Sequence, residues 1–281
     1  MNTTKRIISV LLVILLTASF TMFALASGAS GTTGDVSWCF DETSKTLTIS
    51  GNGSMADYTG KMQPWAKHAY FIRKIVVESG VKRIGNYCFD ALNNAESVEL
   101  PDGLESIGRD AFAWCEFESV SIPDSVTRLE DECFLACSLR SVIIPGNVET
   151  IGRSAFHHCT NLQSVTIQNG VKTIEAEAFR MCYNIQCVTI PASVTEIGEQ
   201  AFTECYDLPC VHYAGSKEEW DAITVGSGNS ELLSAKIHYH DATSLPLCRW
   251  CGEVHLPDKP LQVIKGFFHR IAAALFGARY N

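Results

Sequence analysis

Apolar residues recur along the chain with a fixed period. A phenylalanine returns at successive intervals of 23, 22, 22, 23 and 23 residues, and a Val or Leu stands eight residues before each one. These phenylalanines are Phe89, Phe112, Phe134, Phe156, Phe179 and Phe202. A period in the low twenties indicates a stack of short repeats, each of which buries its apolar face against its neighbours.

Each repeat contains two short extended segments. Val165 and Ile167 alternate with Ser164 and Thr166, which is the two-residue period of a β-strand with one buried face. A turn and the pattern V-x-x-I follow, and then an A-F-x-x-C segment that we expect to form a short helical turn. The pattern predicts a solenoid of mostly short parallel β-strands with short helical turns over residues 75–214.

The two ends of such a stack expose apolar surface and need covering segments. Before the repeats, residues 36–40 and 46–50 have strand patterns on either side of a turn, which predicts a β-hairpin cap within residues 27–74. After the repeats, an S-x-x-E sequence at Ser216 matches a helix capping box, which predicts a helical cap within residues 215–240.

The repeats also resemble a known family. The pattern S-V-T-I-P-x-S-V-T-x-I-G-x-x-A-F-x-x-C occurs with small variations in residues 119–137, 141–159 and 187–205. It is similar to the BspA-like leucine-rich repeats of secreted and surface bacterial proteins, and the resemblance extends over residues 34–240. The resemblance implies a leucine-rich repeat solenoid with an extracellular binding or adhesion role, but it names no ligand.

The N-terminus has the pattern of a secretory signal peptide. Lys5 and Arg6 precede an apolar run over residues 7–16, and the A-x-A sequence that ends at Ala26 is typical of a cleavage site. We therefore expect residues 1–26 to be removed and the protein to be secreted, extracellular or attached to the cell surface. An uncleaved membrane anchor is the alternative.

The C-terminal residues predict a separate amphipathic basic helix. Residues 241–257 form a linker that contains Cys and His, and within residues 258–281 apolar side chains fall on one helical face between positions 261 and 276. Basic side chains interrupt this segment, so it does not fit a bilayer span. It can lie on a membrane or cell-wall surface, dock on the acidic repeats or bind another protein, and the sequence favours none of these.

The charge of the chain argues against a nucleic-acid partner. The chain has a formal net charge of −9 at pH 7, yet its last segment has the opposite sign. From Asp258 onward there is one acidic residue against Lys259, Lys265, Arg270 and Arg279. The repeats are therefore strongly acidic and repel phosphates, so we expect no nucleic-acid partner.

The chain has 12 cysteines, and their place in the repeat indicates their chemistry. Five of them stand three residues after a repeat phenylalanine, where we expect them to stack inside the core: Cys115, Cys137, Cys159, Cys182 and Cys205. Side chains on adjacent turns point the same way, which favours buried thiols over disulfides. Cys187 and Cys210 lie one repeat apart on the outer face, where a disulfide and two thiols both remain open.

Small polar residues line the outer face of the first strand in each repeat. Good strand formers can fill this face with no further role, or their hydroxyl groups can form a flat hydrogen-bonding surface for a glycan or an extended peptide. The face lacks the exposed aromatic residues that usually anchor such ligands. The candidate binding residues are Ser97, Glu99, Ser119, Ser121, Ser141, Ser164, Thr166, Thr189 and His212.

One short motif has the residues of a metal site. Cys248 and Cys251 form a C-x-x-C pair, His255 follows it, and His240 or His238 precedes it. Cysteine and histidine at such spacing can hold zinc tetrahedrally, with His240 as our candidate for the fourth ligand. A short disulfide or a redox pair explains the same cysteines. Structural zinc is the one cofactor that the sequence suggests.

No catalytic motif stands out in the sequence. The chain has no G-x-S-x-G, no H-E-x-x-H, no phosphate-binding glycine loop and no interpretable pair of carboxylates. We therefore expect a non-enzymatic protein that binds or adheres to an extracellular protein or glycan. The alternative is a structural component of the cell surface that is attached through its C-terminal tail.

Overall fold

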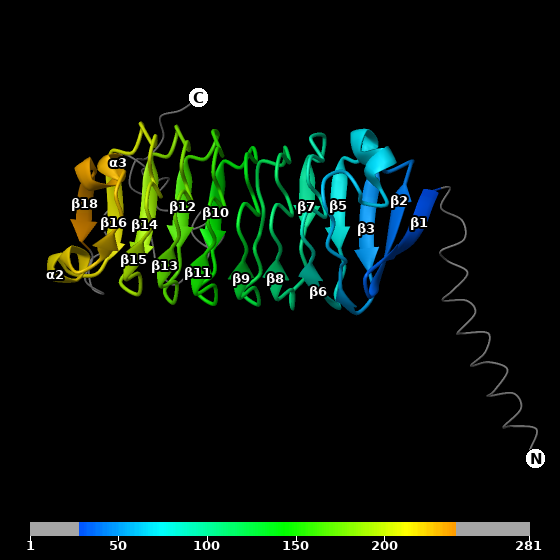
Figure 1. Ribbon diagram of the computed structural model, residues 1–281, viewed down its shortest axis with the longest axis horizontal. Helices are drawn as coiled ribbons and strands as arrows, with labels where there is room; N and C mark the ends of the chain where they lie inside the picture. Colours follow the sequence, from blue (N-terminus) through cyan, green and yellow to red (C-terminus); the bar gives the residue numbers. More distant parts are fainter. Residues whose placement is uncertain (1–27, 240–281) are drawn as a thin grey trace, which may run out of the picture.

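The structure, a computed structural model, describes residues 28–239. Their strands stack along one axis into an elongated solenoid, with β1 (Gly28–Thr33) and β18 (Lys236–Tyr239) near opposite ends (Figure 1). Each repeat of the sequence is one turn of this stack. Within the described range, no helix combines the length and the apolar composition that a membrane span requires.

The first extended segment of each repeat forms one long face of the solenoid. Two five-stranded sheets make this face, in the orders β1-β2-β3-β5-β7 and β10-β12-β14-β16-β18. From β10 onward the strands are parallel and in register, so Val142, Val165, Val188 and Val211 form one buried column. The strands are β2 (Val36–Asp41), β3 (Thr46–Ser50), β5 (Lys74–Val77), β7 (Ser97–Glu99), β10 (Ser141–Ile144), β12 (Ser164–Ile167), β14 (Cys187–Pro191) and β16 (Cys210–Ala214).

The two sheets are separated at residues 119–122, which form no strand although their sequence fits the repeat. The preceding turn holds Phe117, and its ring packs edge-on against Phe112 with the centroids 5.7 Å apart. The later repeats have the smaller Leu139 and Leu162 in the corresponding buried place. The interruption coincides with the largest side chain at this place, Phe117, which is itself fully buried.

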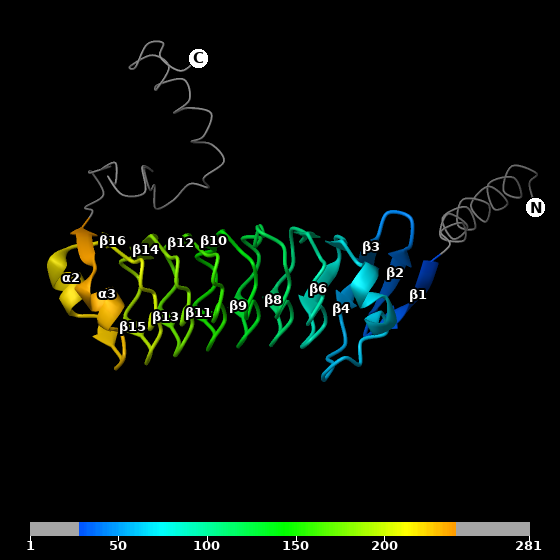
Figure 2. The ribbon, with the colours of Figure 1, turned by 90° about the horizontal axis from the view of Figure 1, so that it is seen from above.

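The second extended segment of each repeat forms another face. Its strands make one eight-stranded sheet in the order β17-β15-β13-β11-β9-β8-β6-β4 (Figure 2). Most of them are two residues long, and buried isoleucines such as Ile151 and Ile174 point from them into the core. The strands are β4 (Gly53–Ser54), β6 (Val81–Ile84), β8 (Ser106–Ile107), β9 (Arg128–Leu129), β11 (Thr150–Ile151), β13 (Thr173–Ile174), β15 (Glu196–Ile197) and β17 (Thr224–Val225).

The A-F-x-x-C segments, expected as short helical turns, are hydrogen-bonded turns with an alternating backbone. The residues two before and two after each repeat phenylalanine have φ between 50° and 64°, and none of them is glycine. As a result, the N–H groups of Phe156 and His158 donate to the next repeat, whereas that of His157 donates within its own turn. A helix would direct all of these groups along one axis, so the turns connect neighbouring repeats instead.

The repeat phenylalanines form a continuous stack through the core. From Phe89 to Phe202, neighbouring ring centroids lie 5.1–5.3 Å apart and the ring planes differ by 3–21°. All six side chains are fully buried, and Trp65 extends the stack at its N-terminal end, 5.8 Å from Phe89. The turns therefore share one core, as the period predicts.

The five repeat cysteines lie beside this stack as buried thiols, which agrees with the prediction. Each Sγ donates to the backbone oxygen of the phenylalanine one repeat earlier, at 3.0–3.3 Å. Burial raises the pKa of the Cys159 and Cys205 thiols to about 12. None of the five forms a disulfide. Their thiols are therefore protonated at neutral pH and serve as small apolar groups.

The two ends contain the elements that the sequence predicts there. β2 and β3 form an antiparallel hairpin, and β1 adds a further antiparallel strand that the pattern did not indicate. A 3₁₀ helix, η2 (Ala66–Phe71), follows the hairpin. At the other end, α2 (Lys217–Asp221) begins at a complete capping box between Ser216 and Glu219, and α3 (Ser230–Ser234) precedes β18.

Candidate binding surface

The predicted polar column lies on the first strands, but its exposure changes along the solenoid. The exposed members are Ser97, Glu99, Ser119, Ser121 and Ser141. Ser164 and Thr166 are half-buried, whereas Thr189 and His212 are only 5% and 1% exposed. The flat exposed surface expected from the sequence therefore does not continue over β14 and β16.

A row of aromatic side chains runs along the turns that follow the repeat phenylalanines. We call Trp114, His158, Tyr183 and Tyr206 the aromatic ridge. In this order their ring centroids lie 6.4, 6.2 and 5.8 Å apart, and the planes of the last two rings differ by 3°. Trp114 is 53% exposed and Tyr206 is 67% exposed. The solenoid thus presents connected aromatic rings to solvent.

The repeat explains how the aromatic ridge forms. Trp114 and His158 stand two residues after a repeat phenylalanine, where φ is 61° and 62°. Tyr183 and Tyr206 stand four residues after one and lie on adjacent turns. The turn between Trp114 and His158 has the small Ala136 at the equivalent place. The two larger rings can therefore meet across it.

Acidic groups border the aromatic ridge at its C-terminal end. The Tyr206 hydroxyl donates to the Glu204 carboxylate at 3.2 Å, and Asp207 is exposed next to it in the sequence. Desolvation, followed by the interaction with Glu204, raises the pKa of the Tyr206 phenol. The hydroxyl therefore stays protonated at neutral pH and is available as a donor. Such an edge combines large apolar rings with negative charge.

A shallow pocket of about 300 Å³ lies near the N-terminal end of the aromatic ridge. Asn94 donates to the backbone oxygen of Tyr70 at 3.2 Å across this pocket. Asn93, with its amide oriented to donate, reaches the backbone oxygen of Trp114 at 3.0 Å and so connects the pocket to the ridge. The lining includes Lys61, Lys67, Tyr70, Asp90, Asn93 and Asn94.

Three predictions from the sequence concern residues outside the described range. They are the signal peptide in residues 1–26, the amphipathic helix in residues 261–276, and the zinc motif of Cys248, Cys251, His255 and His240.

The sequence of the repeats matches a known family. Residues 67–139 and 82–209 match the BspA type leucine-rich repeat region, in six copies. Together these ranges cover more than half of the 281 residues. The chain belongs to the BspA-type leucine-rich repeat family. The resemblance seen in the sequence is thereby confirmed, and so is the leucine-rich repeat solenoid that it implied.

Solved leucine-rich repeat structures give the extent of the likeness. A leucine-rich repeat protein from Eubacterium ventriosum is 21% identical, with 66% of this chain and 73% of that chain covered and a TM-score of 0.45. The pneumococcal vaccine antigen PcpA is 18% identical, with 69% of this chain and 46% of that chain covered and a TM-score of 0.50. The T. pallidum leucine-rich repeat protein is 23% identical, with 65% of this chain and 88% of that chain covered and a TM-score of 0.46. No curated protein matches the chain.

Within this family member, the strand columns alone do not predict the aromatic ridge. Its residues lie in the turns, and the side chain at either of the two equivalent places varies along the chain. The signal that could have found it is the recurrence of large rings at two fixed offsets. These are two residues after Phe112 and Phe156, and four residues after Phe179 and Phe202. An edge-on contact between His158 and Tyr183 then joins the two sets into one row.

Proposed function

We propose that this BspA-type protein is secreted or held at the cell surface and binds a protein partner through the aromatic ridge. The observation that supports this most directly is the connected row of the rings of Trp114, His158, Tyr183 and Tyr206, whose two end members are exposed. Trp and Tyr are enriched at binding hot spots, because they bury a large apolar area for little loss of side-chain freedom. Isolated exposed apolar residues need no explanation, whereas a connected row of rings does.

The charge of the surface indicates the kind of partner. The chain carries a net charge of −9, and Glu204 and Asp207 stand beside the ring of Tyr206. An acidic field attracts a basic partner over long range, and Arg or Lys side chains can then pack on the exposed ring faces. We therefore expect the partner to present a basic segment. This preference separates a protein from a neutral glycan.

The proposed role is non-catalytic. Asp110 is the kind of buried acid that would draw attention in an enzyme, since its pKa is raised to about 6. The causes are burial first, and then repulsion by Glu132 on the adjacent turn. Stacked repeats bring equivalent acids together in this way without any substrate. The perturbed carboxyl therefore follows from the repeat, and it supports no reaction by itself.

Binding measurements on ridge variants test this function. The full chain would be applied to an array of purified extracellular proteins and to an array of glycans. For a protein that it binds, we expect Trp114→Ala and Tyr206→Ala each to weaken binding by about 30-fold, the effect of losing one hot-spot residue. Leu233→Ala is the matched control, because Leu233 is an apolar side chain that is 59% exposed on α3. It should bind like the unaltered protein.

Three outcomes would contradict the proposal. Equal binding by the ridge variants and the control would mean that the ridge is not the binding site. Binding on the glycan array alone would replace the protein partner by a carbohydrate. A chain that binds nothing on either array, yet stays attached to cells through its C-terminal tail, would favour a structural component of the cell surface.

A further inference from the structure

Four neighbouring positions on the outer face of β14 and β16 form a square of side chains. In the parallel register of these strands, Cys187 is paired with Cys210 and Thr189 is paired with His212. Residues two apart along a strand point to the same face, so all four side chains lie on one face. Adjacent strands are about 4.8 Å apart and alternate residues are about 6.6 Å apart, so each corner of the square lies next to two others.

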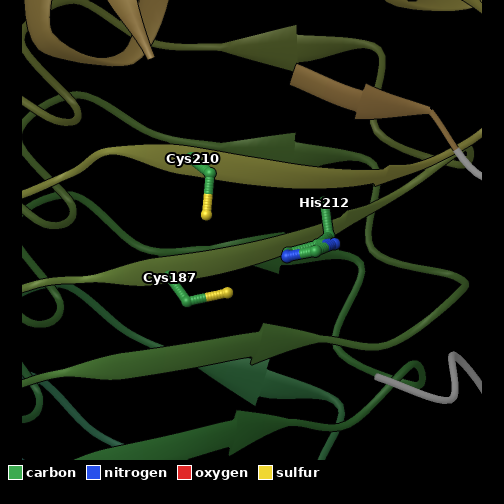
Figure 3. Close-up of side chains that lie close together, drawn as sticks. All are labelled: Cys187, Cys210 and His212. Atoms are coloured by element: carbon green, nitrogen blue, oxygen red, sulfur yellow. The ribbon is translucent and has the colours of Figure 1, made fainter. Parts of the chain in front are cut away.

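Three corners of the square carry metal-binding groups that lie close together. The Sγ atoms of Cys187 and Cys210 and a ring nitrogen of His212, all from buried residues, lie within 4.8 Å of one another. Figure 3 shows these side chains pointing toward a common point from neighbouring strands. Ligand atoms at about 2.0–2.3 Å from a tetrahedral zinc ion are about 3.5–3.8 Å apart. Side-chain shifts of about 1 Å therefore bring all three groups onto one ion.

The fourth corner of the square has a buried hydroxyl group. Thr189 is only 5% exposed, and its Oγ1 atom has no hydrogen-bond partner among the described residues. Buried polar atoms nearly always have a partner. This hydroxyl stands beside both Cys187 and His212, so it points to a polar group bound at the centre of the square.

The repeat itself does not require this set of residues. The equivalent places in β10 and β12 hold serine in one column, and isoleucine or threonine in the other. One further contact fixes the orientation of the imidazole. The ring of His238 on β18 stacks on that of His212, with the centroids 5.1 Å apart. Because β16 lies between β14 and β18 in the sheet, His238 supports His212 from the side away from Cys187.

We propose that Cys187, Cys210 and His212 bind a zinc ion whose fourth ligand is a water molecule hydrogen-bonded to Thr189. Thiolates and imidazoles are preferred ligands of zinc, and three protein ligands with one water is a four-coordinate arrangement that it adopts in proteins. The two thiols release their protons to solvent on binding, because only the thiolate coordinates the metal. In-register side chains that point the same way suit a shared ion better than a disulfide.

The metal would join the last two full repeats of the solenoid. Its ligands come from β14 and β16, which stand 23 residues apart in the sequence. An ion that binds only the folded arrangement stabilises it by mass action. The site draws on solenoid residues alone and needs neither Cys248 nor Cys251 of the zinc motif predicted from the sequence.

Metal analysis in a background without that predicted motif tests the site. The full chain with Cys248→Ser/Cys251→Ser, loaded with zinc and freed of excess metal, should retain one zinc ion. Adding Cys187→Ser or His212→Asn should abolish zinc binding. Adding the control Cys39→Ser, which changes a partly exposed cysteine on β2, should leave it intact. Loss of zinc from the starting double variant, or full zinc content after Cys187→Ser, would overturn the proposal.

The role of Thr189 has a matched control on the neighbouring strand. In the same background, Thr189→Val removes the hydroxyl but keeps the shape, and we expect it to weaken zinc binding by about 10-fold or more in competition with a chelator. The Oγ1 atom of Thr166 on β12 is also buried without a partner, but Thr166 is not a corner of the square. Thr166→Val should therefore keep the original affinity. Equal affinities of the two variants would contradict the proposal.

A further measurement changes no residue of the solenoid and so does not depend on the folding of altered strands. X-ray absorption at the zinc edge of the starting double variant should show two sulfur atoms at about 2.3 Å and two nitrogen or oxygen atoms at about 2.0 Å. Any other number of sulfur ligands would overturn the proposal. So would a chain in which Cys187 and Cys210 are joined, which mass spectrometry would detect as the loss of two hydrogens.

Discussion

Replacing Phe156 by alanine tests whether the phenylalanine stack stabilises the solenoid. Phe156 is fully buried, and its ring lies 5.3 Å from both Phe134 and Phe179. Backbone hydrogen bonds between the turns, such as that from Phe156 N–H to Ala178 O at 2.8 Å, hold the neighbours at this spacing. The void left by the ring therefore cannot collapse. A buried Phe→Ala change costs about 3–5 kcal/mol, and we expect the upper half of this range.

Urea unfolding followed by circular dichroism measures this cost. The Phe156→Ala midpoint should fall while the slope stays unchanged, because the surface exposed on unfolding is nearly the same. Tyr206→Ala is the control, since its ring is 67% exposed and stacks only in the aromatic ridge. Its cost should stay below about 1 kcal/mol. If Phe156→Ala costs no more than this control, the stack is not a source of stability and the reasoning fails.

Two further predictions concern single positions. Because the folded-state pKa of Asp110, about 6, exceeds its unfolded value, folding stability falls as pH rises between them. Asp110→Asn should therefore stabilise the folded protein at pH 7 by on the order of 1 kcal/mol after screening, and so raise its melting temperature. At pH 3 it should not. An equal change of the melting temperature at both pH values would contradict this. Ala136 has φ of 53°, which costs a non-glycine residue about 1–2 kcal/mol. Ala136→Gly should raise the urea midpoint, whereas the exposed control Ala192→Gly, at an ordinary φ, should not.

The period of the sequence predicted the architecture because stacked repeats place equivalent residues in columns. Val142 and Val165 face the core in register, and β16 pairs with β18 in the same parallel way. The backbone of the A-F-x-x-C turns was not predictable in this way. An apolar pair at positions i and i+3 fits a helical turn as well as a turn in which φ alternates in sign. The pattern therefore favoured the commoner structure.

The candidate sites, like the fold, could be predicted only in part from the sequence. Strand alternation correctly places Cys187 and His212 on the outer face, but it does not reveal that they are buried there. It also says nothing about rings in the turns, such as Trp114 and Tyr206, whose contact with neighbours depends on tertiary stacking. Local patterns thus predict the direction in which a side chain points. Its burial depends on segments that meet only in three dimensions.

The buried thiols place a constraint on the order of events during folding. In the unfolded chain the repeat cysteines are ordinary reactive thiols, whereas in the folded chain Cys159 and its equivalents are protonated and inaccessible. An oxidant that arrives first can join thiols that must stack separately, and such crosslinks would trap the chain. The core must therefore close before oxidation. Each turn contacts mainly the next one, 22 or 23 residues away, and contacts of this short range favour rapid folding. The period that builds the core thus also protects it during assembly.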